Sequence, residues 1–137
     1  MSFVFLAIAL ATLSPTAQDS GAPSVDVAAS ESGAADAARH WLDLVDAQDW
    51  KASYEGTSAA FRQANTLELW TDASQRVQAG LGKFVSRDFI GADDVPSPQG
   101  FTMVKFRADY AKRKGVLETL SLVRENGAWK IAGIYVS

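Results

Sequence analysis

The first clear alternation of apolar and polar residues lies in ESGAADAARHWLDLVDAQ, residues 31–48, and predicts an amphipathic helix. Its apolar residues recur at intervals of three and four, a spacing that places side chains on one side of a helix of about four turns. The apolar side contains Ala34, Ala38, Trp41, Leu42 and Val45. The polar side contains Asp36, Arg39, His40, Asp43 and Asp46. We therefore expect the first set to cover the core and the second to face solvent.

A shorter helical pattern follows in DWKASYEGTSAAFRQAN, residues 49–65. Asp49 can cap a short helix on which Trp50 and Tyr54 share a face. Gly56 interrupts this helix before a turn around Phe61. These pieces are short, so we expect them to depend on the first helix for support.

A third helix is predicted to begin at Asn65 or Thr66, since either side chain can accept a backbone hydrogen bond as the N-cap. Glu68 falls in its first turn, where the helix dipole favours a negative charge. Gly80 and Gly82 end the helix. Its apolar stripe consists of Leu67, Trp70, Ala73, Val77 and Leu81.

After Gly82 the apolar period changes from near four to two, which predicts strands at 83–90, 101–111 and 116–125 and a last strand after the Asn126–Gly127 turn. Residues 91–100 are rich in turn formers and are expected to form a loop. In the strand over 101–111, the residues expected to face inward are Val104, Phe106, Ala108 and Tyr110. Helices followed by antiparallel strands favour an α+β fold. We expect about three N-terminal helices on one face of a curved, cone-like antiparallel sheet of about four strands.

The two-residue turn at Asn126–Gly127 also predicts the register of the last hairpin. On one side of the sheet, the expected pairs are Arg124 with Trp129, Leu122 with Ile131, and Leu120 with Gly133. Thr119 is expected to face Ile134 on the other side, and Glu118 falls in register with Tyr135. Ile131 should therefore complete a buried face with Leu122.

The residues before the first helix differ in composition from the rest. FVFLAIALATL, residues 3–13, is an uncharged apolar run that is too short for a transmembrane helix and has the length of a signal-peptide core. Ala17 and Ala22 offer possible cleavage points. We divide the chain into 1–17, a signal peptide or N-terminal apolar segment; 18–30, a flexible linker; and 31–137, a single α+β domain. The expected location is periplasmic or secreted, and no stable membrane span is expected in the mature form.

Composition excludes several classes of function. The net charge of -3 gives no basic face for nucleic acid. The chain has no cysteine, which excludes disulfides, thiolate zinc sites, cysteine nucleophiles and lipidation on cysteine. A single histidine among carboxylates expected to face solvent gives no metal site. We expect neither a cofactor nor a metal.

The order of these motifs resembles a bacterial family known as domain of unknown function 4019. The matching positions are Trp41 and Leu42, Tyr54, Phe61 and Arg62, Trp70, and Trp129 and Lys130. The resemblance covers about residues 35–136. This family in turn resembles the nuclear transport factor 2-like, or cystatin-like, α+β cone that also houses ketosteroid isomerase and scytalone dehydratase. The resemblance implies that fold and an exported protein, and it supplies no activity.

Several residues are candidates for chemistry. His40 lies beside Asp36 and Asp43 on the helical wheel and could act as an oriented base, but we favour a solvated helix face because the apolar stripe runs on the opposite side. By analogy with isomerases of the cone superfamily, Glu118 or Asp109 with Tyr110 could act inside a cavity. Asp109 alternates with basic residues and is expected on the polar face. The candidates for lining a ligand pocket are Trp41, Tyr54, Trp70 and Glu118, although the helical spacing of the aromatic ones favours core packing over a pocket.

Three functions remain open from the sequence. The first, which we favour because the sequence offers many aromatic residues and no catalytic constellation, is a non-catalytic exported domain. It would bind a small apolar ligand or a protein partner, such as another envelope protein, through the mouth of the cone or the open face of the sheet. The second is a small isomerase, dehydratase or hydrolase that uses a cavity carboxylate. The third is a self-association module that forms a homodimer through the outer face of its sheet. A closed cavity of roughly 300 Å³ or more, with an ionisable group pointing into it, would favour a ligand inside the fold.

Overall fold

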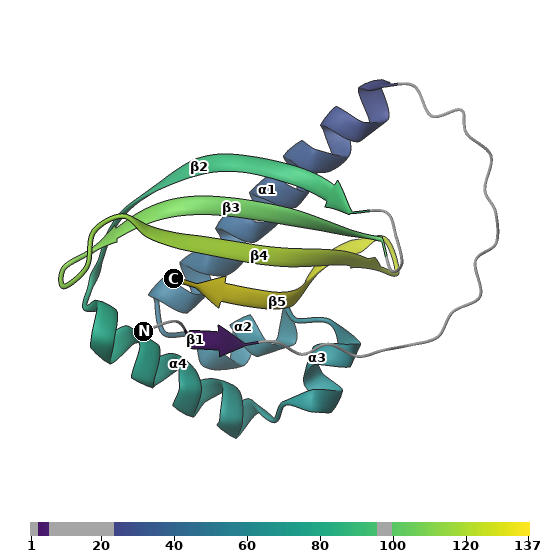
Figure 1. Ribbon diagram of the computed structural model, residues 1–137. Coiled ribbons are helices and arrows are strands. Elements are labelled where there is room, and N and C mark those ends of the chain that lie inside the picture. The colour runs from purple at the N-terminus through teal and green to yellow at the C-terminus, as the bar shows by residue number, and fades with distance from the viewer. Residues whose placement is uncertain (1–2, 6–23, 96–99) are drawn as a thin grey trace.

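The computed structural model describes residues 3–5, 24–95 and 100–137 (Figure 1). The elements are β1 (Phe3–Phe5), α1 (Ser24–Asp46), α2 (Trp50–Glu55), α3 (Ala59–Ala64), α4 (Leu67–Leu81), β2 (Phe84–Val95), β3 (Phe101–Tyr110), β4 (Val116–Glu125) and β5 (Ala128–Val136). Helix α1 begins within the segment assigned to a linker, and β1 within the segment assigned to a signal peptide. The rest of these segments, residues 1–2 and 6–23, lies outside the described residues.

The α+β architecture expected from the sequence is confirmed. Strands β2 to β5 form an antiparallel sheet that is not closed into a barrel, and the short strand β1 pairs with β5, so the strand order is β1-β5-β4-β3-β2. Figure 1 shows α1 crossing behind the curved sheet, with α2, α3 and α4 gathered beside β5 and β1. None of the helices in the described residues combines the length and apolar character that a membrane crossing needs.

The helix boundaries follow from local capping chemistry. The side chain of Asp49 accepts a hydrogen bond from the Ala52 amide (3.1 Å), and that of Thr66 accepts one from the Leu69 amide (3.1 Å). The expected turn around Phe61 is a further short helix, α3, because Ser58 Oγ caps it through the Phe61 amide at 3.1 Å. In α4 the predicted stripe residue Leu67 is instead exposed.

The core lies between α1, α4 and the inner face of the sheet. The alternation predicted for β3 is confirmed, because Val104, Phe106, Ala108 and Tyr110 are buried while Arg107 is exposed. Buried residues from the helices complete this core: Ala34, Ala38, Trp41, Leu42, Phe61, Trp70 and Leu81.

Strand β2 is longer than the sequence indicates. Residues 91–95, expected to form a loop, continue the pairing with β3 as far as Val95 opposite Phe101. Residues 96–99 of the expected loop lie outside the described residues. Val85 and Ile90 are extra residues at two irregularities in the β2–β3 register. Such bulges allow the strand to bend and change which residues face inward.

The register of the last hairpin is confirmed only near its turn. Arg124 pairs with Trp129, and Leu122 with Ile131, as predicted. A bulge at Ala132 then shifts the strand by one residue. The predicted pairs of Leu120 with Gly133, Thr119 with Ile134, and Glu118 with Tyr135 are therefore wrong. The observed pairs are Leu120 with Ile134, Thr119 with Tyr135, and Glu118 with Val136. The bulge changes which alternate residues of β5 face the core. Ile131 before it and Ile134 and Val136 after it are therefore all buried.

Candidate functional site

A buried network of charged side chains lies where the end of α1 meets the sheet. Arg87 Nε donates to Glu118 Oε1 at 2.6 Å, and Arg87 Nη1 donates to Asp46 Oδ2 at 2.8 Å. The exposed fraction of the side chain is 3% for Arg87, 2% for Glu118 and 15% for Asp46. A guanidinium and two carboxylates are therefore held together almost entirely away from bulk water. We call Asp46, Arg87, Tyr110 and Glu118 the ion network.

The remaining polar atoms of the ion network are also bonded. Arg87 Nη2 donates to Glu118 Oε2 at 3.1 Å, to Asp46 Oδ1 at 3.3 Å and to Tyr110 Oη at 3.2 Å. Tyr110 Oη in turn donates to Glu118 Oε2 at 2.7 Å. The guanidinium carbon lies 4.5 Å from the centre of the Phe84 ring, a cation–π contact. The planar guanidinium thus bridges two carboxylates in the forked geometry that arginine provides.

Each member of the ion network reaches it by a different local route. Glu118 lies between the inward residues Val116 and Leu120 on β4, so strand alternation buries it. Arg87 faces inward because the bulge at Val85 changes the parity of β2 after Phe84. Asp46, which was expected on the polar side of α1, turns to the sheet at the end of the helix. That expectation is wrong because Arg87 offers Asp46 a buried partner.

The surroundings of the ion network shift the pKa values of its groups. Burial raises the pKa of Asp46 above its ordinary value of 3.8, and the bonds from Arg87 only partly oppose this. For Arg87, burial lowers the pKa, but the hydrogen bonds to Glu118 and Asp46 outweigh it and raise the value overall. Burial, followed by the negative charge of Glu118, raises the pKa of Tyr110. Arg87 is therefore charged and Tyr110 neutral at any physiological pH.

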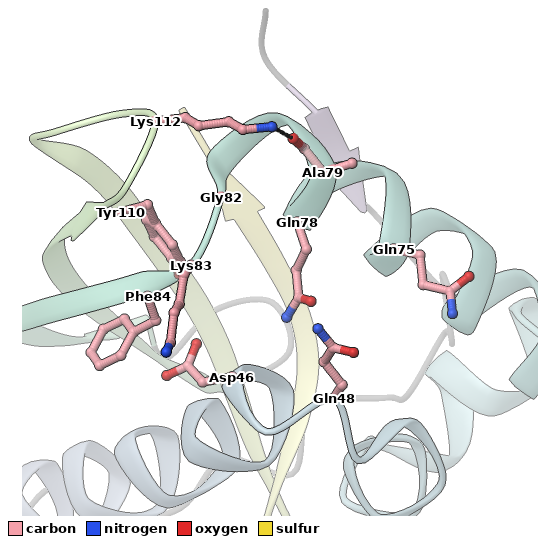
Figure 2. Close-up of a pocket in the computed structure, with 10 residues that line it drawn as sticks. All are labelled: Asp46, Gln48, Gln75, Gln78, Ala79, Gly82, Lys83, Phe84, Tyr110 and Lys112. Atoms are coloured by element: carbon pink, nitrogen blue, oxygen red, sulfur yellow. Dashed lines mark hydrogen bonds between the residues drawn. The ribbon is translucent and has the colours of Figure 1, made fainter.

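An open cleft of about 660 Å³ lies beside the ion network (Figure 2). It is bounded by the end of α1 and the turn after it, the second half of α4, the α4–β2 connection, and the end of β3 with the turn that follows. The lining residues are Asp46, Gln48, Gln75, Gln78, Ala79, Gly82, Lys83, Phe84, Tyr110 and Lys112. Asp46 and Tyr110 belong to both the cleft and the ion network, so the buried charges connect directly to this opening.

Local structure holds the polar side chains of the cleft in place. Gln78 Nε2 donates to the Val45 carbonyl at 2.8 Å, and Lys112 Nζ donates to the Ala79 carbonyl at 2.9 Å. Gln48 adopts a positive φ of 60°, which is uncommon for a residue other than glycine. Gly82 has a φ of 79°, and a Cβ there would lie 2.9 Å from Lys112 Cγ. Figure 2 shows the Gln48 and Gln78 side chains directed toward each other and Lys83 directed toward Asp46.

A second, much smaller cavity lies between the helices and the sheet. Its volume is about 40 Å³, enough for a few water molecules and no more. Most of its lining is apolar, from residues such as Leu42, Trp70 and Ile134, but Glu118 and Tyr110 also reach it. Ser74 Oγ is buried here without a hydrogen-bond partner among the described residues.

Comparison with known families decides the relationship that the motif order suggests. The family model for proteins of unknown function called DUF4019 matches residues 37–134. The chain belongs to the DUF4019 family. No curated protein matches it. Both the ion network and all of the cleft residues lie within the matched range, so the candidate site is part of the DUF4019 domain itself.

Among the predicted pocket residues of this DUF4019 domain, only Glu118 belongs to the ion network. Trp41 and Trp70 are buried, with ring centres 5.6 Å apart. Their indole N–H groups donate to the carbonyl (2.8 Å) and the hydroxyl (2.9 Å) of Ser53. Tyr54 Oη donates to the Asn65 carbonyl at 2.6 Å and ties α2 to the end of α3. The aromatic residues thus join the helices to one another, and Trp70 also lines the small cavity.

Tyr110, the tyrosine named with Glu118 as a candidate, also belongs to the ion network, whereas His40 and Asp109 lie outside it. His40 is exposed on α1. Asp109 Oδ1 accepts a hydrogen bond from the Gly115 amide at 2.8 Å, so this carboxylate closes the β3–β4 turn. In the part of the DUF4019 domain that the structure describes, no group of three or more acidic or histidine side chains could hold a metal ion.

Sequence reasoning missed Arg87, Asp46 and the polar cleft. A signal for Asp46 was present, because it follows Leu42 by four residues and so extends the apolar row of Ala34, Ala38 and Leu42. No comparable signal exists for Arg87, since regular alternation from Phe84 would turn Ser86 inward instead. The cleft is built from three connecting segments that are distant in sequence, and no spacing pattern links them.

Proposed function

We propose that this DUF4019 domain is a non-catalytic ligand-binding domain whose site is the open cleft beside the ion network. The observation that carries the proposal is the size and lining of the cleft. Its volume of about 660 Å³ falls within the range of about 300–1,000 Å³ that is usual for small-molecule sites. Its amide, ammonium and carboxylate groups, with the Phe84 ring, suit a polar organic ligand.

The interior of the fold is less suitable for a ligand. An apolar ligand would need the space between the helices and the sheet, where the cavity measures only about 40 Å³. The aromatic side chains that could have lined a larger cavity fill the helix layer instead. The polar cleft therefore replaces the apolar pocket as the site that we favour.

Catalysis by Glu118 is also less favoured by the geometry. Both of its carboxylate oxygens accept hydrogen bonds from Arg87 or Tyr110, so the lone pairs that a base would use are already occupied. The cavity beside Glu118 has no room for an organic substrate. A base that is both occupied and enclosed has no route to abstract a proton from a substrate.

A thermal-shift screen of the purified domain tests the proposal. The screen should compare polar metabolites with lipids, sterols and envelope peptides, and we expect stabilisation by members of the polar set. Gln75→Trp would fill part of the cleft from α4 and should abolish binding. Gln63→Trp, at an exposed position on α3 outside the cleft lining, is the matched control and should leave binding intact. If polar ligands bind Gln75→Trp as tightly as the unsubstituted chain, the cleft is not the site.

A second candidate function is pairing of two copies through β2. This strand lies at an edge of the sheet, and Val85, Phe89 and Ile90 are 63%, 47% and 48% exposed on it. Val85 and Ile90 are bulges, and bulges interrupt the regular ladder that edge-to-edge pairing requires. We therefore favour the cleft over this pairing. Light scattering across a concentration series distinguishes a monomer from a dimer, and a monomer at every concentration would exclude this pairing.

Export and superfamily membership complete the proposal. The apolar run at 3–13 supports export to the periplasm or the medium. Cleavage after Ala17 or Ala22 would remove β1 from its place beside β5. Mass spectrometry of the protein from a periplasmic fraction would show whether the chain begins after one of these residues. The order of helices and curved sheet supports a place in the nuclear transport factor 2-like superfamily, and superposition of an experimental structure on its members tests this.

A further inference from the structure

The ion network carries one more negative charge than positive charge. Within the described residues, Arg87 is the one cation that pairs with the carboxylates of Asp46 and Glu118. Tyr110 stays neutral and adds no compensating charge. Glu118 is enclosed, whereas Asp46 keeps 15% of its side chain exposed and lines the cleft. The excess negative charge of the ion network therefore reaches the cleft at Asp46, toward which the Lys83 side chain is directed without forming an ion pair among the described residues (Figure 2).

The same cleft also presents positive charge. Lys83 and Lys112 both line it. Lys112 uses one N–H on the Ala79 carbonyl, which leaves two N–H groups for a ligand. Lys83 forms no ion pair in the part of the chain that the structure describes. The cleft thus combines an acceptor that lacks a full counter-charge with two ammonium donors that retain bonding capacity.

We infer that the cleft binds a small zwitterion with a primary ammonium and a carboxylate, namely a free amino acid or a short peptide. The ligand ammonium would bond to Asp46, and the ligand carboxylate to Lys83 and Lys112. This inference rests on the proposed function, because it names the ligand class of the same cleft. The amides of Gln48 and Gln75 offer further donors and acceptors for the polar atoms of a peptide unit.

Ligands with charge of one sign fit the cleft less well. A dicarboxylate would place a second negative charge beside Asp46, and a diamine would place a second positive charge beside the lysines. Repulsion of this kind discriminates between ligands as effectively as attraction does. A neutral sugar would leave Asp46 and the two lysines without an oppositely charged partner.

Calorimetry with matched probes on the full chain tests the inference. Standard amino acids and small peptides are titrated one at a time, and the strongest binder is then compared with its N-acetyl and carboxamide forms. Acetylation removes the ammonium, and amidation removes the carboxylate. Each change is expected to weaken binding roughly tenfold or more, because each removes a charge-assisted hydrogen bond. Amide chemical shifts of cleft residues should move on titration.

Substitutions assign each end of the ligand to its partner. Asp46→Asn should weaken binding of the zwitterion and of its carboxamide, but not that of the N-acetyl form. The double variant Lys83→Met with Lys112→Met should weaken binding of the zwitterion and of its N-acetyl form, but not that of its carboxamide. Asp36→Asn and Lys51→Met, exposed charges outside the cleft lining, are the matched controls and should change nothing. Because Lys83 and Lys112 are exposed, the lysine variants remain informative even if Asp46→Asn fails to fold.

The outcomes separate this inference from the proposed function. Binding of sugars, diamines or dicarboxylates in the cleft without any zwitterion would overturn the ligand class and leave the proposed function standing. Equal affinity for the zwitterion, its N-acetyl form and its carboxamide would also overturn the ligand class and leave the proposed function standing. If no compound of the polar set shifts the cleft residues, the proposed function fails, and the inference fails with it.

Discussion

At the scale of single residues, Arg87 determines whether two carboxylates can be buried. Removing one partner of a buried ion pair leaves an uncompensated charge and typically costs about 3–5 kcal/mol, because the remaining ion has lost its water as well. In this domain Arg87 forms ion pairs with both Asp46 and Glu118. Its loss would leave two buried negative charges that repel each other with no cation between them. Loss of one carboxylate would instead leave a neutral ion pair.

Arg87→Met should therefore lower the free energy of unfolding by about 3–5 kcal/mol, and Glu118→Gln should cost less. The matched control is Arg107→Met on the outer face of β3, where the guanidinium donates to the Gly115 carbonyl from an exposed position. A change within about 0.5 kcal/mol is expected there. Urea unfolding of the three variants measures these values. Equal losses for Arg87→Met and Arg107→Met would show that the network does not support the fold.

The raised pKa of Asp46 predicts the direction of a pH effect. Because the folded state holds this proton more tightly than the unfolded chain does, the contribution of Asp46 to stability is fully present below its ordinary pKa of 3.8. That contribution is lost as the pH rises through the folded pKa. Asp46→Asn removes this titration, so the stability of the variant relative to that of the unsubstituted chain should increase as the pH rises from about 3 toward neutrality.

Urea unfolding across this pH range tests the effect, with Gln63→Ala, at an exposed and non-titrating residue of α3, as the control. The difference in unfolding free energy between Asp46→Asn and the unsubstituted chain should change with pH, whereas that for Gln63→Ala should stay nearly constant. Parallel stability curves for the Asp46→Asn variant and the unsubstituted chain would contradict a raised pKa at this carboxylate.

At the scale of elements, the sequence predicts what depends on regular periodicity. The apolar rows of α1 and α4, the cap residues Asp49 and Thr66, and the inward face of β3 follow directly from spacing and side-chain chemistry. On the helices the errors are single residues, Leu67 and Asp46, and in the sheet they lie where a strand departs from regular alternation. Ala132 shifts the register of β5, and Val85 turns Arg87 inward. A bulge changes parity without leaving a fixed sequence signature.

The same reasoning explains how much of the candidate site could be predicted. The burial of Glu118 could be predicted from the sequence, because Glu118 interrupts a row of inward-facing apolar residues on β4. Its partner Arg87 was not, since only the three-dimensional register brings β2 to it. The cleft depends on how the α1–α2 turn, the α4–β2 connection and the β3–β4 turn meet, and such long-range proximity lies beyond any local pattern.

At the scale of the whole molecule, the candidate site lies where the helix layer and the sheet meet. Asp46 comes from the end of α1, Tyr110 from the end of β3, and both contact Arg87 on β2. A ligand bonded to Asp46 would therefore add to a network that already joins the two layers. Binding in the cleft should stabilise the folded state as a whole, which makes thermal shift an appropriate readout for the proposed function.

The last strand should be indispensable to the whole fold. A chain truncated after Gly127 loses the buried side chains of Ile131, Ile134 and Val136, each worth about 1.5–3 kcal/mol of burial. It also loses the backbone bonds from the Ser58 amide to the Ile131 carbonyl (2.8 Å) and from the Ile131 amide to the Gly56 carbonyl (3.0 Å), which tie β5 to the α2–α3 connection. These losses approach the entire stability of a small domain, about 5–15 kcal/mol.

We therefore expect the truncated chain to be unfolded, with no cooperative thermal transition by circular dichroism and no dispersed amide resonances. The matched control lacks only Ser137, which exchanges two backbone hydrogen bonds of 3.0 Å with Leu117 and contributes no buried apolar side chain. That variant should melt cooperatively at a slightly lower temperature. A cooperative transition in the chain truncated after Gly127 would mean that the helices and β2–β4 form a core without β5, contrary to the burial that β5 provides.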